Sequence, residues 1–154
     1  MADQDKTPVT VDTVEYSTST PFVANITTGR VVKVYDGDTI TVATNVINDN
    51  VSETFYRFSV RIRGIDCPEI RTKNVTEKEC AEIAKQTVMD AVYHKIVTLT
   101  NVSYDKYGRI LADVSIGDIS VSKMLLDKRL AISYDGGKKT SPDDWMQYYS
   151  GETN

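Results

Sequence analysis

In the run from residue 55 to residue 65, apolar and polar side chains alternate, and this pattern constrains the fold more than any other feature of the chain. The apolar positions are Tyr56, Phe58, Val60 and Ile62, and the polar positions are Arg57, Ser59, Arg61 and Arg63. A period of two places successive side chains on opposite faces of a β-strand. We therefore predict a strand over residues 55–65 whose apolar face belongs to a core, with Arg61 pointing away from that core.

Further strands are indicated by runs of β-branched and aliphatic residues. They are predicted at residues 30–35, 39–44, 96–103 and 109–116. The first two flank Asp36 and Gly37, a dipeptide that strongly favours a hairpin turn. A Tyr-Gly turn separates the last two.

Apolar residues at helical spacing between Cys80 and Val92 predict an amphipathic helix that ends near Tyr93. Thr76 to Glu79 have the pattern of a capping box at its start. Shorter helices are predicted over residues 120–129 and from an N-cap at Ser141 through Tyr149.

This order, five strands with a helix after the third and another after the fifth, suits an α+β, mainly β fold. We predict an OB-type five-stranded β-barrel with two to three α-helices. The chain of 154 residues fits one domain, which we place at residues 29–150. Residues 1–28, rich in Thr, Ser and Val, are predicted to form an extended or flexible arm, and residues 151–154 a tail.

Composition limits the functional classes. Hydrophobic residues make up 40 % of the chain, and no apolar run approaches the roughly 20 residues of a membrane span. The acidic first residues lack the apolar core of a signal peptide, so we expect an intracellular (cytoplasmic) protein, or one packaged in a viral assembly. Two cysteines do not form a disulfide framework. A net charge of −4 argues against broad electrostatic attraction to nucleic acid, so chemistry on nucleic acid must depend on individually placed arginines and a bound cation.

Three short segments concentrate carboxylates and arginines at predicted strand ends. They are Asp36-Gly37-Asp38-Thr39, Arg61-Ile62-Arg63-Gly64-Ile65-Asp66-Cys67-Pro68-Glu69 and Asp105-Lys106-Tyr107-Gly108-Arg109. Each segment alone has an ordinary interpretation as a turn or a polar strand end. Together they combine carboxylates that can gather a hard cation with two guanidinium groups that can bind a phosphate. That combination suits cleavage of phosphodiester bonds.

In this order and spacing, the three segments resemble those of the staphylococcal nuclease-like (thermonuclease) domain family. The resemblance covers about residues 29–134. It implies a Ca²⁺-dependent phosphodiesterase, endo- or exonucleolytic, that hydrolyses DNA and RNA with low sequence specificity and leaves 3′-phosphate products.

The resemblance also implies a role for each matched residue. For catalysis these are Arg61, Glu69 and Arg109; for Ca²⁺, Asp38, Asp66 and the backbone carbonyl of Cys67; for substrate binding, Lys106, Tyr107 and Tyr134; and as a supporting acid, Asp36. The two arginines would bind the scissile phosphate, and Glu69 would act as the general base or orient the attacking water.

A rival interpretation is a catalytically weak or inactive module that binds nucleic acid or protein, for instance as a component of a viral or other large assembly. The N-terminal arm, a candidate contact for another protein, and the acidic charge favour the rival. The presence of all five central residues favours the nuclease; these are Asp38, Arg61, Asp66, Glu69 and Arg109. The oligomeric state stays open.

Overall fold

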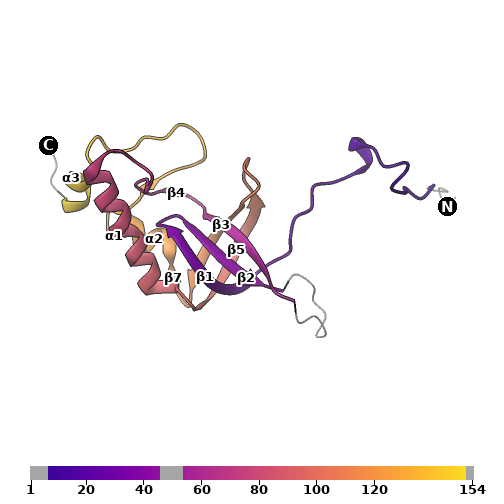
Figure 1. The fold of residues 1–154 in the computed structure, drawn as a ribbon, viewed down its shortest axis with the longest axis horizontal. Coiled ribbons are helices and arrows are strands. Elements are labelled where there is room, and N and C mark those ends of the chain that lie inside the picture. Colours follow the sequence, from indigo (N-terminus) through magenta and orange to yellow (C-terminus); the bar gives the residue numbers. More distant parts are fainter. Residues whose placement is uncertain (1–6, 46–53, 152–154) are drawn as a thin grey trace.

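A computed structural model describes residues 7–45 and 54–151 of the chain (Figure 1). In chain order the elements are η1 (Tyr16–Thr18), β1 (Thr28–Asp36), β2 (Thr39–Thr44), β3 (Tyr56–Ile62), β4 (Ile65–Asp66), α1 (Val75–Val92), β5 (Ile96–Tyr104), β6 (Ile110–Ile116), β7 (Ile119–Ser120), α2 (Val121–Asp127), β8 (Ile132–Ser133) and α3 (Trp145–Ser150).

The five long strands close into a barrel. The sheet order is β3-β2-β1-β5-β6-β7, with antiparallel neighbours throughout. A parallel pairing of β3 with β6, from Val60 opposite Ile110 to Ile62 opposite Ala112, joins the two ends of this order. The closed mixed barrel with three α-helices confirms the predicted α+β, mainly β, OB-type fold.

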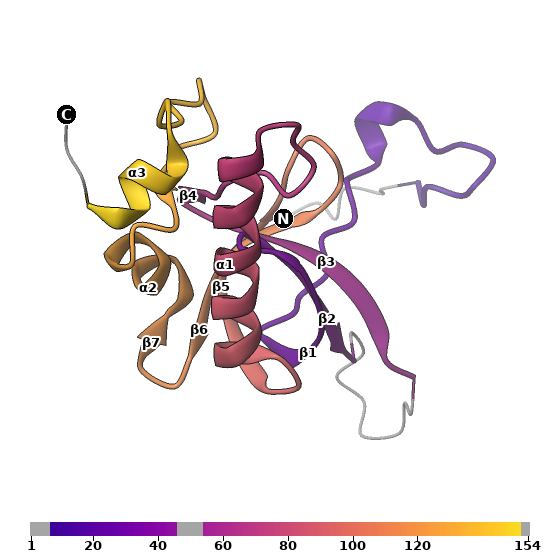
Figure 2. The same cartoon turned by 60° about the vertical axis from the view of Figure 1, so that its left-hand side comes forward.

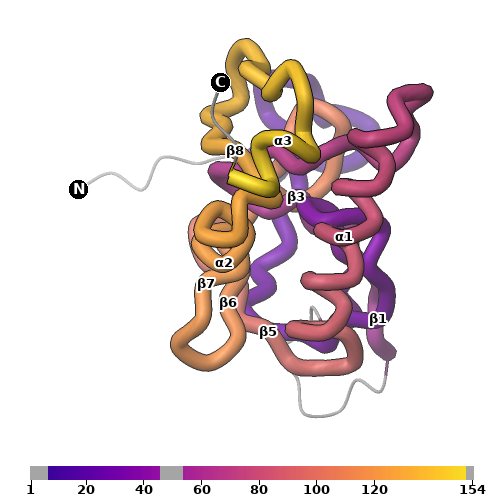
Figure 3. The backbone as a smooth tube through the Cα atoms, turned by 90° about the vertical axis from the view of Figure 1, so that its left-hand side faces the viewer, coloured from indigo at the N-terminus to yellow at the C-terminus, as the bar shows by residue number. Residues whose placement is uncertain are grey.

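The barrel interior and the inner faces of the helices form one hydrophobic core. Its largest fully buried side chains include Ile40, Ile62, Ile65, Leu99 and Ile110. The helices gather on one side of the barrel, where α1 runs along the strands beside α2 and α3 (Figure 2). Seen from that side, α3 lies next to the first turns of α1 (Figure 3), and its Trp145 is buried. This packing fixes the position of the long connection that precedes α3.

Three predicted boundaries are wrong for local reasons. The predicted strand over residues 55–65 ends at Ile62, because Gly64 turns the chain with a φ of +86° before the short strand β4 begins. α1 is capped by Asn74, whose side chain accepts a hydrogen bond from the Glu77 backbone N–H at 3.0 Å, and not by Thr76. α3 is likewise capped by Asp144 rather than Ser141.

The described N-terminal residues lie outside the barrel up to residue 23 and then enter its core. Residues 7–23 are exposed and extend away from the strands (Figure 1). Ala24 and Ile26 are buried in the core, and the Leu99 backbone N–H donates to the Thr27 carbonyl at 2.7 Å. The domain limits at residues 28/29 and 150/151 stay a prediction. Among the described residues, no helix is both long and apolar enough to span a membrane.

Candidate active site

The β1–β2 hairpin turn and the segment from the end of β3 to the end of β4 meet and bring the first two sequence motifs together. The Ile62 backbone N–H donates to the Asp38 carbonyl at 2.8 Å, which ties the β1–β2 turn to the end of β3. The Cys67 backbone N–H donates to Asp38 Oδ2 at 2.9 Å, which ties the same turn to the segment after β4. Gly37 is required here, because a Cβ at this position would lie 2.8 Å from the Cys67 sulfur. Asp36, Asp38 and Asp66 are all buried.

Arg61 lies at the centre of these acids. Its Nη1 donates to the carbonyls of Ile62 and Ile65, at 2.9 Å each. Its Nη2 lies 3.3 Å from Asp66 Oδ1 and 3.5 Å from Asp38 Oδ2. Arg61 is outside the hydrophobic core cluster, as the alternation predicts, but it is only 9 % exposed. Its guanidinium is therefore held rigidly before any ligand arrives.

Burial and mutual repulsion shift the protonation of the acids. Burial, together with the neighbouring charge of Asp38, raises the pKa of Asp36 to about 7. Burial also raises the pKa of Asp66, although Lys139 and Arg61 act in the opposite direction. A cluster of this kind favours a cation that can offset its charge.

Lys139 supplies such a charge, and the sequence motifs did not predict it. Its Nζ lies 3.2 Å from Asp66 Oδ1 and 3.3 Å from Glu69 Oε1. Burial opposes the charged form, but the contacts with Asp66 and Glu69 prevail and raise the pKa of Lys139. Lys139 follows Gly136, Gly137 and Lys138 in the connection between β8 and α3, and nothing in that spacing signals a return to the acids.

Glu69 lies at the solvent side of the acidic group, with its side chain 55 % exposed. Its backbone N–H donates to Glu77 Oε1 at 3.1 Å, and the Thr72 hydroxyl donates to Glu77 Oε2 at 3.2 Å. Glu77 thus holds the connection between β4 and α1 in place. It is a further residue that the motifs did not identify.

Arg109 lies in a separate, more open turn between β5 and β6. The backbone N–H groups of Tyr107 and Arg109 donate to Asp105 Oδ1, at 2.9 Å each, and Arg109 Nε donates to Asp105 Oδ2 at 2.7 Å. Burial acts against the ionised form, but these bonds outweigh it and lower the pKa of Asp105. The charges of Lys106 and Arg109 lie 5.2 and 5.4 Å from the centre of the Tyr107 ring, which is itself exposed.

One cavity of about 600 Å³ is lined by both predicted arginines and also by Arg63. The predicted residues that line it are Arg61, Arg109, Lys106, Tyr107 and Tyr134. The remaining predicted residues are not part of this lining; they are Asp36, Asp38, Asp66, Cys67 and Glu69. The structure therefore separates a cavity with arginines and tyrosines from the buried carboxylates of Asp36, Asp38 and Asp66; Arg61 lines the cavity and contacts Asp38 and Asp66.

The donor chemistry of the acids fits a hard cation. Asp38 and Asp66 each place one oxygen within 3.5 Å of Arg61 Nη2, so the two carboxylates lie beside the same guanidinium. Carboxylate and carbonyl oxygens are the ligands that Ca²⁺ prefers. The Cys67 side chain is buried in the core and its thiol pKa is raised by burial, so only its backbone is suited to such a site. Over residues 7–45 and 54–151, no group of three or more His, Cys, Asp and Glu side chains is arranged to hold a metal ion.

Comparison with known proteins agrees with this geometry. A family model described as "Staphylococcal nuclease homologue" matches residues 59–153. The chain belongs to this family. The matched region of this nuclease homologue includes the second and third motifs and Lys139, whereas Asp36 and Asp38 precede it.

Two curated relatives carry endonuclease names. An uncharacterized endonuclease of Haemophilus influenzae is 33 % identical over 107 residues, which cover 70 % of this chain and 52 % of the relative. A protein of Schizosaccharomyces pombe named as a probable endonuclease is 32 % identical over 85 residues, which cover 51 % of this chain and 37 % of the relative. The chain spans about half or less of the length of these relatives.

Proposed function

We propose that this chain is a Ca²⁺-dependent nuclease that hydrolyses phosphodiester bonds of DNA and RNA with low sequence specificity and leaves 3′-phosphate products. The observation that carries the proposal is the position of Arg61. Arg61 lines the cavity shared with Arg109, while its guanidinium contacts the carboxylates of Asp38 and Asp66. A phosphate in that cavity would thus meet guanidinium groups with carboxylates behind them.

Arg61 and Arg109 are the groups that would bind the scissile phosphate. A guanidinium presents a planar fork that can donate to two phosphate oxygens at once. Arg61 is fixed by two backbone carbonyls, so little reorganisation is needed when charge develops on the phosphate. Arg109, which lines the same cavity, is held by its ion pair with Asp105 and lies over the Tyr107 ring.

Asp38, Asp66 and the backbone carbonyl of Cys67 would hold the cation, with Asp36 as a supporting acid. The chemistry that a bound Ca²⁺ supplies there is polarisation of a phosphoryl oxygen. The Glu69 carboxylate would orient a water molecule or take a proton from it; in support, it shares Lys139 Nζ with Asp66 and its side chain is open to solvent. Lys106, Tyr107 and Tyr134 would contact the remainder of the nucleotide in the cavity.

A cleavage assay tests the proposal. Single-stranded DNA and RNA are incubated with the protein in Ca²⁺ or in chelator, and the product ends are analysed for a 3′-phosphate. We expect cleavage in Ca²⁺ only, and a loss of about 10²–10³-fold in Glu69→Gln. Glu82→Gln is the matched control, because Glu82 is an exposed glutamate on α1.

The same assay separates the nuclease from a binding module. Binding without cleavage in Ca²⁺ would favour the rival module. Cleavage that persists both in chelator and in Glu69→Gln would contradict the proposed mechanism.

A further inference from the structure

The ammonium group of Lys139 lies where the proposed metal site opens to solvent. It contacts Asp66 Oδ1 at 3.2 Å, and the same oxygen lies 3.3 Å from Arg61 Nη2. The Asp66 side chain is 3 % exposed, whereas that of Lys139 is 48 % exposed. One oxygen of a proposed Ca²⁺ ligand is thus shared by two cationic groups, and the outer one belongs to a loop.

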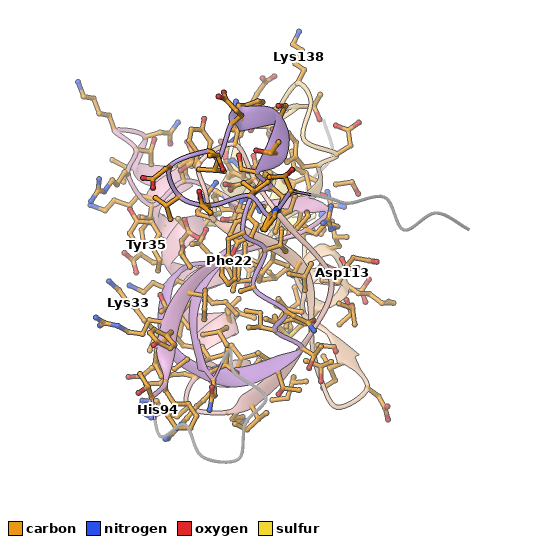
Figure 4. All side chains as sticks on the ribbon, turned by 90° about the vertical axis from the view of Figure 1, so that its right-hand side faces the viewer. Phe22, Lys33, Tyr35, His94, Asp113 and Lys138 are labelled. Atoms are coloured by element: carbon orange, nitrogen blue, oxygen red, sulfur yellow. The ribbon has the colours of Figure 1, made fainter. Side chains whose placement is uncertain are left out.

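That loop is anchored on both sides of Lys139. Before it, β8 pairs with β4, and the Tyr134 backbone N–H donates to the Gly64 carbonyl at 2.9 Å. The Tyr134 hydroxyl then donates to the Gly137 carbonyl at 3.1 Å. After it, α3 packs on α1 with Trp145 buried. These anchors hold the loop so that Lys139 contacts the carboxylates of Asp66 and Glu69. The side chain of its neighbour Lys138 instead points into solvent (Figure 4).

We propose that Lys139 is an intramolecular cation that occupies the edge of the metal site and that a divalent ion must displace from Asp66. The inference rests on the proposed function, because it requires Asp38 and Asp66 to bind the ion. An ammonium group and a divalent ion near one carboxylate repel each other, and each weakens the attraction of that carboxylate for the other. The ammonium is strongly hydrated and its stem is flexible, so it can leave while the buried Arg61 cannot.

The cavity lined by Tyr134 lies next to the Lys139 ammonium group and could receive it after displacement. Lys139 Nζ already lies 5.9 Å from the centre of the Tyr134 ring, and Tyr134 lines the cavity of the two arginines. Release from Asp66 would leave the ammonium at the rim of that cavity. Occupation of the metal site would thereby move a positive charge toward the place where an anionic substrate binds.

Calorimetric Ca²⁺ titrations of the wild-type chain, Lys139→Met and Lys138→Met test the inference. Methionine keeps a long flexible stem and removes the charge. We expect Lys139→Met to bind Ca²⁺ about tenfold or more tightly than wild type, because it has no ammonium to displace. Lys138→Met should bind within about twofold of wild type, which excludes a general effect of lost positive charge.

A second measurement uses the wild-type chain, so it does not depend on how a variant folds. Amine acylation is followed by mass spectrometry at Lys139 and, as an internal reference, at Lys138. We expect Lys139 to become more reactive relative to Lys138 when Ca²⁺ saturates the site.

The outcomes separate this inference from the proposed function. If wild type binds Ca²⁺ but Lys139→Met binds it equally or more weakly, the displacement of Lys139 is wrong while the metal site remains supported. The same conclusion follows if the reactivity of Lys139 is unchanged when Ca²⁺ saturates the wild-type chain. If neither protein binds Ca²⁺, the metal site fails and the displacement fails with it. Binding by Lys139→Met alone would support displacement in its strongest form.

Discussion

Arg61 and Arg109, two of the three arginines that line the cavity, are held in opposite ways. Arg61 is 9 % exposed and lies between two backbone carbonyls and two buried carboxylates. The Arg109 side chain is 33 % exposed and pairs with Asp105, four residues away in the same turn. The same chemical group is thus part of the folded interior in one case and part of a surface turn in the other.

Because of this difference, we expect Arg61 to contribute to both folding stability and phosphate binding, and Arg109 mainly to phosphate binding. Removal of one partner from a buried ion pair leaves an unpaired charge in the interior, whereas an exposed pair contributes little to folding. Both guanidinium groups can still make similar contacts with a phosphate in the cavity. The buried group of acids and the open turn should therefore respond differently to the same kind of substitution.

Arg61→Ala should have the largest effect. It should lower the free energy of unfolding by about 3–5 kcal/mol, because Asp38 and Asp66 lose their shared guanidinium. Cleavage should also fall by about 10²–10³-fold. Urea unfolding in chelator and cleavage of single-stranded DNA measure the two effects. An Arg61→Ala protein as stable as wild type would contradict the distinction between the buried acids around Arg61 and the open turn that carries Arg109.

Arg109→Ala should lose cleavage to a similar extent, about 10²–10³-fold, but change the free energy of unfolding by about 1 kcal/mol or less. Lys123→Ala is a matched control, because Lys123 and Asp127 form another pair four residues apart, on α2. The control should leave cleavage unchanged. If Lys123→Ala lost as much cleavage as Arg109→Ala, the effect of Arg109 would not be specific to the site.

The sequence predicts the barrel well because its signals are local. The alternation in β3 and the hairpin at Asp36 and Gly37 each depend on neighbouring residues only. The hairpin is present in the structure, and Val60 and Ile62 are in the core with Phe58 packed against it, but Tyr56, predicted on the same face, is exposed. The motifs also gather the two arginines and the tyrosines at one cavity. Alternation gives the face on which Arg61 lies but not its depth, because depth depends on what packs over that face.

The residues that the sequence missed depend on the path of distant segments. Lys139 reaches Asp66 because α3 and β8 hold a long connection against the acids, and no local spacing encodes that return. Glu77 reaches back to the Glu69 backbone only because the chain turns between β4 and α1. The helix starts were misplaced since two residues able to cap lie close together, Asn74 with Thr76 in one case and Ser141 with Asp144 in the other.

The two regions should also differ in their response to pH. Asp36 has a folded-state pKa of about 7, above its unfolded value of 3.8, so the native state retains a proton that the unfolded state releases. The contribution of Asp36 to the free energy of unfolding is present below the unfolded pKa and is lost as the pH rises through about 7. This change is a few kcal/mol at most. Asp105 has a lowered pKa, so its contribution is present above the unfolded pKa and is lost as the pH falls.

Asn substitutions test this contrast by urea unfolding in chelator across the acidic to neutral range. Asp36→Asn should flatten the fall in stability between about pH 4 and pH 7, because Asn cannot titrate but still offers an oxygen to the Asp38 N–H. Asp105→Asn should instead reduce the loss of stability at lower pH. Parallel pH profiles for wild type and Asp36→Asn would contradict the raised pKa.

The smallest effect should come from Glu77, which holds the backbone of Glu69 and does not line the cavity. Glu77→Ala removes the acceptors for the Glu69 N–H and the Thr72 hydroxyl, at a cost of about 1 kcal/mol in unfolding free energy. Because the Glu69 carboxylate then loses a fixed backbone, cleavage should fall by about tenfold while substrate binding stays near wild type. Glu79→Ala, which removes an exposed carboxylate from the same turn of α1, should change neither quantity. If Glu77→Ala weakens substrate binding as strongly as cleavage, Glu77 holds the whole segment between β4 and α1 rather than the orientation of Glu69. The contrast between the rigid acidic group and the open β5–β6 turn would then extend beyond the two arginines.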